Sequence, residues 1–68
     1  SKLENHIHNS QHFYVGDRVE AKAADGSLNP FFPGEISAVH HVDAYYKYTV
    51  MFDDGDQKTI SQFSIIHG

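Results

Sequence analysis

Apolar residues alternate with polar ones in short stretches along the chain, and each stretch ends at Gly, Pro, Asn or Asp. In Arg18–Ala23, small apolar residues alternate with charged ones, which is the period of a half-buried strand. Its apolar face consists of Val19, Ala21 and Ala23. Asp25 and Gly26 then predict a turn. This pattern favours β-strands over helices.

Two longer stretches are predicted to form the central strands. Phe31–His41 contains Gly34, which indicates a bulge or the close approach of a neighbouring strand. Tyr46–Phe52 is the clearest strand, because Tyr, Thr, Val and Phe favour pleated, half-buried positions. The residues expected to face the core are Ile36, Ala38 or Val39, Tyr48, Val50 and Phe52.

A hairpin is predicted after the clearest strand. Asp54 and Gly55 are typical of a type I′ turn, in which both central residues need a positive φ. The turn predicts a further strand over Asp56–Ile60. This strand should pair antiparallel with Tyr46–Phe52.

The end of the chain predicts one short helical turn and a closing strand. Ser61–Ser64 is expected to form a single 3-10 turn, and Ile65 with Ile66 to form the last strand. Five short antiparallel strands without a long helix indicate an all-β fold, a small barrel. We expect a flexible leader over Ser1–His12 and the barrel over Phe13–Gly68.

The charge balance narrows the class of partner. Nine Asp and Glu against five Lys and Arg give a net charge of −4. Nucleic-acid binding through counterion release needs the opposite sign, so it is disfavoured, whereas an acidic surface attracts basic peptides. The chain has no cysteine, which favours a reducing compartment, the cytosol or the nucleus. No apolar run approaches the roughly 18 residues that span a bilayer, so we expect no membrane contact.

The sequence gives little support for a metal site or a catalytic site. His6, His8 and His12 lie close together, but they belong to the predicted leader, which offers no fixed geometry. The acidic run at 53–56 lacks the ligand spacing of a calcium loop. There is no Cys, no Gly-x-Ser-x-Gly and no phosphate loop. The sequence predicts a binding module without metal or cofactor, and not an enzyme.

Three blocks of sequence carry a resemblance to a known family. They are Val15–Lys22, Phe32–Ile36 and Tyr48–Asp56, the last containing Phe-Asp-Asp-Gly. Together they resemble the Tudor domains of chromatin readers, over about Phe13–Ile66 of the chain. The resemblance implies an SH3-like barrel of five bent antiparallel strands, a nuclear location, and in many members a cage of aromatic rings around a methylated lysine or arginine.

The cage that the resemblance implies is partly filled. Phe32 matches the aromatic residue that begins the second strand, Phe52 the one that ends the third, and Asp54 the neighbouring acid. Aromatic faces and a carboxylate attract a weakly hydrated methylammonium through cation–π and charge contacts. A purely structural interpretation stands beside this one, because alternating aromatics in a small barrel are usually core residues.

Two cage positions lack an aromatic ring. The first strand ends in Ala23, and the hairpin carries Asp56 and Lys58 where the family often adds a ring. The aromatic residues that we expect to complete the cage are Phe31, Tyr45 and Tyr46. One of the two tyrosines has an alternative role as a cover over the open end of the barrel.

Two functions follow from these observations. The first is a non-catalytic reader of methylated lysine, with methylated arginine as the weaker alternative, on a basic peptide such as a histone tail. The second is a scaffold Tudor domain that has lost its cage and contacts an unmodified protein or a neighbouring Tudor or other reader domain.

Overall fold

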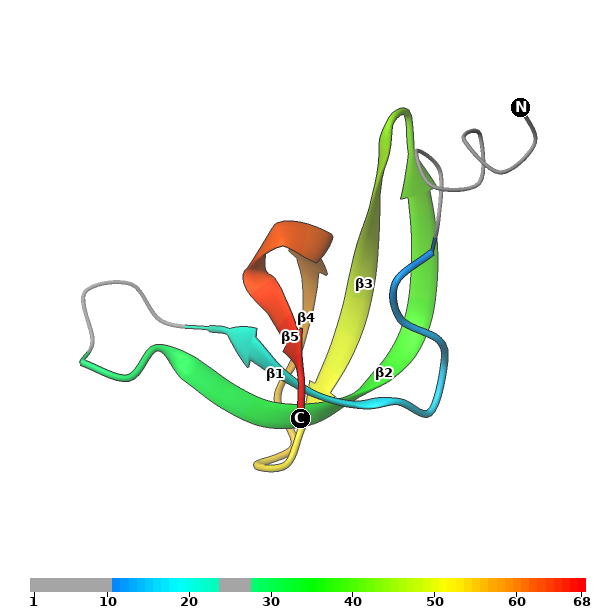
Figure 1. Cartoon of the computed structure of the whole chain (residues 1–68). Helices are drawn as coiled ribbons and strands as arrows, with labels where there is room; N and C mark the ends of the chain where they lie inside the picture. The colour runs from blue at the N-terminus through cyan, green and yellow to red at the C-terminus, as the bar shows by residue number, and fades with distance from the viewer. Residues whose placement is uncertain (1–10, 24–27) are drawn as a thin grey trace.

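The computed structural model describes residues 11–23 and 28–68, which form one antiparallel sheet (Figure 1). Within these residues the elements are β1 (Arg18–Lys22), β2 (Phe31–Val42), β3 (Tyr45–Phe52), β4 (Gln57–Ser61), the 3-10 turn η1 (Gln62–Ser64) and β5 (Ile65–His67). The spatial order is β4-β3-β2-β1-β5. The predicted all-β fold of five antiparallel strands, with one 3-10 turn before the last, is confirmed and is consistent with a small SH3-like barrel.

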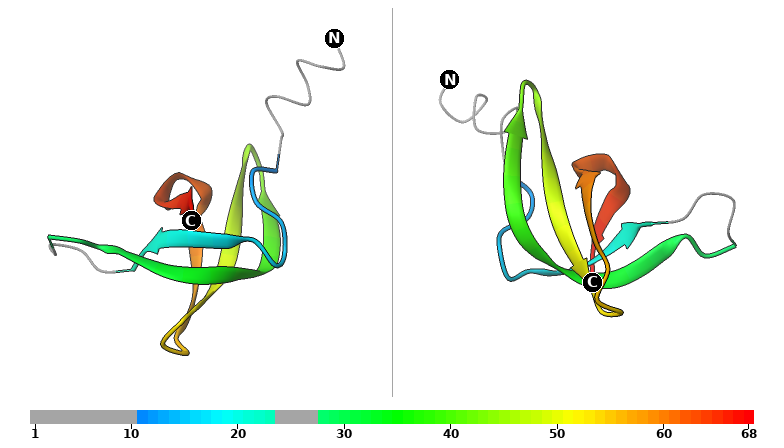
Figure 2. Two further views of the ribbon diagram at one scale, coloured as in Figure 1. Left: turned by 60° about the horizontal axis from the view of Figure 1, so that its bottom comes forward. Right: turned by 180° about the vertical axis from the view of Figure 1, so that it is seen from behind.

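β2 is the strand that bends the sheet. Its first residues pair with β1, from Phe31 opposite Lys22 to Glu35 opposite Arg18. The remainder pairs with β3, up to Val42. Figure 2 shows β2 running along the base of the molecule and then turning into the tall hairpin that it forms with β3. The single long strand therefore serves both halves of the barrel.

The core is built from one face of each strand. Tyr48, Val50 and Phe52 alternate along β3 and are all buried, as the sequence pattern predicted. The buried apolar residues of the described chain are Phe13, Val19, Ala21, Ile36, Tyr48, Val50, Phe52 and Ile65. Ala23, Val39, Tyr46 and Ile60 pack against them. Of the two residues left open on β2, Val39 is the one that contacts the core.

Gly34 lies where β2 and β3 approach most closely. A Cβ atom at this position would be 2.7 Å from the carbonyl oxygen of Met51 and 2.8 Å from a methyl carbon of Val50. The sequence left a bulge and a close approach open at Gly34, and the structure has the close approach. The register shift in β2 lies farther on, between Ile36 and Ala38.

The segment before β1 closes one side of the barrel. Phe13 is buried, and its N–H donates to the Tyr48 hydroxyl oxygen at 3.3 Å, which also accepts from the His12 N–H at 3.1 Å. Apart from Gln11 and His12, the predicted leader falls outside the described residues, as does the turn predicted at Asp25 and Gly26.

The turn between β3 and β4 differs from the predicted type I′ turn. Gly55 has a φ of 94°, but Asp54 does not have the positive φ that a type I′ turn also requires. Instead, the Gly55 N–H donates to the Phe52 carbonyl at 2.9 Å, and the Phe52 N–H donates to the Asp56 carbonyl at 2.8 Å. The loop therefore has three residues and ends in a glycine of positive φ, which needs only one such position.

Candidate functional site

Phe32 and Phe52 stand on the same face of the sheet at one end of the barrel. Phe32 lies opposite Ala21 of β1, and Phe52 lies opposite Gly34 of β2. Paired residues point to the same face, and Ala21 is buried, so both rings lie on the core-facing side. Their exposure differs sharply: Phe32 is 41% exposed and Phe52 only 4%. Phe52 is a core residue, while Phe32 offers a ring to solvent.

The acidic β3–β4 turn packs against the start of β2. The Asp53 N–H donates to the Pro33 carbonyl at 3.1 Å. Phe32 and Asp54 are each one residue from this hydrogen bond, so the ring and the carboxylate belong to the same end of the barrel. We call this region, Phe31–Pro33 together with residues 53–56, the turn end.

The acids of the turn have different roles. Asp53 forms an ion pair with Arg18 through two hydrogen bonds of 2.9 and 2.7 Å, which tie the turn to β1. Asp54 accepts a hydrogen bond from the Asp56 N–H at 2.9 Å and remains exposed. The bidentate guanidinium of Arg18 neutralises the Asp53 carboxylate, whereas the Asp54 carboxylate has no such cation bound to it in the described structure. Asp54 is therefore the better placed of the two to meet a cationic ligand.

The ion pair predicts a pH dependence of stability. Hydrogen bonds from Arg18 lower the pKa of Asp53 below its ordinary value of 3.8. A lowered folded pKa means that the pair stabilises the fold above the pKa of the unfolded carboxyl, and that this contribution is lost as the pH falls through the folded pKa. We expect Asp53→Asn to be less stable than wild type at neutral pH, with a gap that closes below about pH 4.

Urea unfolding at low salt, from neutral pH to about pH 2, measures this gap. Glu35→Gln is the matched control, since Glu35 faces Arg18 in the ladder but makes no hydrogen bond to it in the described structure. A difference between Asp53→Asn and wild type that stays constant down to the lowest pH would contradict the prediction.

Lys58 of β4 contacts the residue that follows β1. Its ammonium donates to the carbonyl oxygen of Ala23 at 3.1 Å, joining β4 to the end of β1. Ala23 is the position where the resemblance predicts an aromatic ring, and the methyl group of alanine cannot replace one. A cation of the protein itself therefore lies at Ala23, the residue that follows β1 and whose N–H donates to the Pro30 carbonyl just before Phe31.

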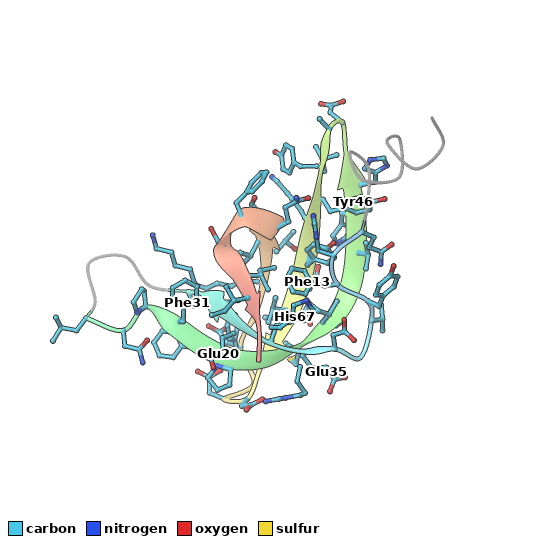
Figure 3. All side chains as sticks on the ribbon, viewed as in Figure 1. Phe13, Glu20, Phe31, Glu35, Tyr46 and His67 are labelled. Carbon is cyan, nitrogen blue, oxygen red and sulfur yellow. The ribbon has the colours of Figure 1, made fainter. Side chains whose placement is uncertain are left out.

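The tyrosines predicted to complete the cage lie elsewhere. β3 begins at Tyr45 and ends at Phe52, so Tyr46 and Phe52 are separated by about 20 Å at roughly 3.3 Å per residue. Figure 3 shows Tyr46 high on the β2–β3 hairpin and Phe31 at the far end of the molecule. Tyr45 and Tyr46 also point to opposite faces, being neighbours on one strand. The structure therefore does not bring Tyr45 and Tyr46 to the end of β3 where Phe52 lies.

Phe31 belongs to the turn end but points to the other face of the sheet. It lies opposite Lys22, one residue along β1 from the buried Ala21, and successive residues of a strand alternate between faces. Its half-buried ring therefore does not stand beside Phe32 as a second wall. Of the six predicted cage residues, Phe32 and Asp54 are exposed at the same end of the barrel, where Phe52 is buried in the core.

A stack of rings begins at the hairpin end of β2 and β3, away from the turn end, and its contacts continue to β5. His41 stacks on Tyr46 with ring centroids 4.4 Å apart, and Tyr46 stacks on Tyr48 at 6.2 Å. Phe13 meets Tyr48 edge-on at 5.2 Å and His67 at 4.6 Å. Tyr46 thus covers this end of the core, which is the alternative role considered for one of the tyrosines.

An apolar groove of about 430 Å³ lies beside this stack. Its lining includes Phe13, Phe63 of η1, and Ile65 and Ile66 of β5. Phe63 and Ile66 are among the exposed large apolar residues. The sequence reasoning missed this groove, although Phe63 in a polar turn between two short strands was a visible signal.

Over residues 11–23 and 28–68, no three His, Asp or Glu side chains gather as ligands for a metal ion. Nor does this part of the chain contain a helix long and apolar enough to cross a membrane.

Five antiparallel strands in one bent sheet, with one 3-10 turn, are consistent with the class of small SH3-like barrels. Residues 13–62, more than half of the chain, match the family model described as Histone methyltransferase Tudor domain 1, and the chain belongs to that family. No curated protein and no solved structure matched the chain. The predicted resemblance to Tudor domains is confirmed.

Proposed function

We propose that the domain is a non-catalytic module that binds methylated lysine on a basic peptide such as a histone tail. Methylated arginine is the weaker alternative ligand. The family description names histone methyltransferases, so we place the module in a nuclear protein that modifies histones, where it would hold the enzyme on its substrate.

The observation that carries this proposal is the exposed ring of Phe32 beside the acidic turn. A ring that is 41% exposed on the core-facing side of the sheet presents a face to a ligand. Asp54 is exposed one residue from the bond between Asp53 and Pro33. A methylammonium would contact the ring face and the carboxylate together, and one cation–π contact contributes about 0.5 to 2 kcal/mol.

The geometry also sets the strength of binding. Phe52 is too deeply buried to offer a full ring face, and Ala23 supplies none. One open ring and one carboxylate form half a cage, so the ordering cost of the peptide offsets most of the gain. We expect affinities in the micromolar to millimolar range.

The test is a titration of labelled protein with trimethylated, dimethylated and unmethylated basic peptides, followed through backbone amide shifts by NMR. We expect methyl-dependent shifts around Phe32 and Asp54. Phe32→Ala should abolish them, whereas Met51→Ala should not, because Met51 is equally exposed at 40% but faces the opposite side of β3. Equal shifts for all peptides, or loss in both variants, would overturn the proposal.

A methylation-independent scaffold is the second candidate function. It is favoured by the apolar groove with its exposed Phe63 and Ile66, since such a surface is typical of protein contacts. The partner would be a neighbouring Tudor or other reader domain. Shifts confined to Phe63 and Ile66 on addition of such a domain would support this function.

A further inference from the structure

Lys58 begins on the face of β4 that points to the core. It lies opposite Val50 in the β3–β4 ladder, and Val50 is completely buried. Paired residues share a face, so the Lys58 side chain leaves its strand in the direction of the barrel and not of the outer surface. Two residues farther along the same face, Ile60 packs against the core.

The Lys58 side chain spans the gap between β4 and the end of β1. β4 is one edge of the sheet, and β1 lies three places away in the strand order, so no ladder joins them. The hydrogen bond of 3.1 Å from Lys58 to the Ala23 carbonyl bridges this gap, and the Ala23 N–H in turn donates to the Pro30 carbonyl, next to Phe31 of the turn end. A side chain with a long aliphatic stem and a charged head can cover apolar surface while its head stays in water.

We propose that Lys58 determines the ligand specificity of the turn end, by acting as an internal competitor for cationic ligands. This inference rests on the proposed function, because it concerns the same site. The Lys58 ammonium occupies the side of the site that lacks a ring. A methylated lysine that approaches Phe32 and Asp54 must therefore displace this ammonium or accept a like charge beside it.

The electrostatic effect of such a neighbour is large enough to decide binding. Two like charges in close contact repel each other several times more strongly near a protein surface than in water. Removing the charge should therefore raise the affinity for a methylammonium by about tenfold. The native chain should bind such ligands weakly, and a change that neutralises Lys58 should open the site.

The experiment compares Lys58→Met with wild type. Methionine keeps an apolar stem but removes the charge and the donor. The probe is a trimethylated basic peptide, titrated by NMR, with the unmethylated peptide in parallel. Lys47→Met is the matched control, since it removes the same charge from β3 at a position opposite Ser61 and His40, away from the turn end. Lys58→Arg keeps the charge.

We expect Lys58→Met to bind the trimethylated peptide about tenfold more tightly than wild type, with Lys47→Met and Lys58→Arg unchanged. On titration of wild type, the carbonyl carbon of Ala23 should shift as Lys58 leaves it. An equal gain in Lys58→Met and Lys47→Met would show a general charge effect and overturn the inference, as would equal affinity of Lys58→Met and wild type.

The outcomes separate this inference from the proposed function. If wild type binds and loses binding with Phe32→Ala, but Lys58→Met matches wild type, the function holds and the role of Lys58 is refuted. If only Lys58→Met binds, Lys58 is the competitor and the native chain is not a methyl-lysine reader. If neither protein binds, both are refuted.

Discussion

Phe52→Ala is expected to unfold the domain. Phe52 is 4% exposed and packs in the same cluster as Val50 and Ile36, so its removal leaves a large cavity. Phe→Ala in a core costs about 3 to 5 kcal/mol. At roughly 0.05 to 0.15 kcal/mol per residue, a chain of this length has only about 3 to 10 kcal/mol of stability. Circular dichroism during urea unfolding, with amide dispersion by NMR, measures the loss.

Phe32→Ala is the control for this prediction. It removes the same side chain from the same face, but from a position that is 41% exposed. We expect it to fold with a stability close to wild type and to lose methyl-dependent binding. A well-folded Phe52→Ala protein that loses only ligand binding would contradict the assignment of Phe52 to the core and make it a wall of the cage.

The strands could be predicted from the sequence because each presents its core face at every second residue. Val19 and Ala21 on β1, and Tyr48 and Val50 on β3, follow this alternation and are completely or almost completely buried. The type and length of the β3–β4 loop could be predicted less well. Asp54 with Gly55 suggests a two-residue loop, but the positive φ falls on Gly55 alone, and a three-residue loop starting at Asp53 uses the same residues.

The positions of Tyr45 and Tyr46 depend on information that the local sequence does not contain. The sequence predicts a strand that begins at Tyr46, and the cage hypothesis required the rings at its start to reach Phe32 and Phe52. In the structure β3 begins at Tyr45, because Val42 pairs with it across a tight turn in which Asp43 adopts a φ of 50°. Tyr45 is the one residue added to the predicted strand, and pairing with β2 holds both rings on the hairpin, away from Phe52.

The contact made by Lys58 could not be predicted from the sequence either. Alternation places it on the core-facing side of β4, where a lysine is unusual, and this was a usable signal. Its partner is a backbone carbonyl 35 residues away on a strand that does not pair with β4. Contacts of this kind depend on how the sheet closes, which the periodicity of single strands does not specify.

Gly34→Ala is expected to destabilise the domain by about 3 kcal/mol, the upper part of the range for overpacking. The new Cβ atom would be 2.7 Å from the Met51 carbonyl oxygen, which belongs to the backbone of β3 and cannot rotate away. Gly34 has no positive φ, so alanine meets no conformational penalty there, and the loss would be purely steric. Urea unfolding followed by circular dichroism gives the free energy.

Gly16→Ala separates the steric effect from the general cost of replacing a glycine. Gly16 has a φ of 97°, and nothing lies within 4 Å of the position of its Cβ atom, so only backbone strain of about 1 kcal/mol is expected. A Gly34→Ala protein no less stable than Gly16→Ala would mean that β2 and β3 can move apart at this point. Phe32 lies only two residues from Gly34 on β2, so separation of β2 from β3 at Gly34 would also loosen the turn end. The affinity for a methylated peptide should then fall together with the stability of the domain.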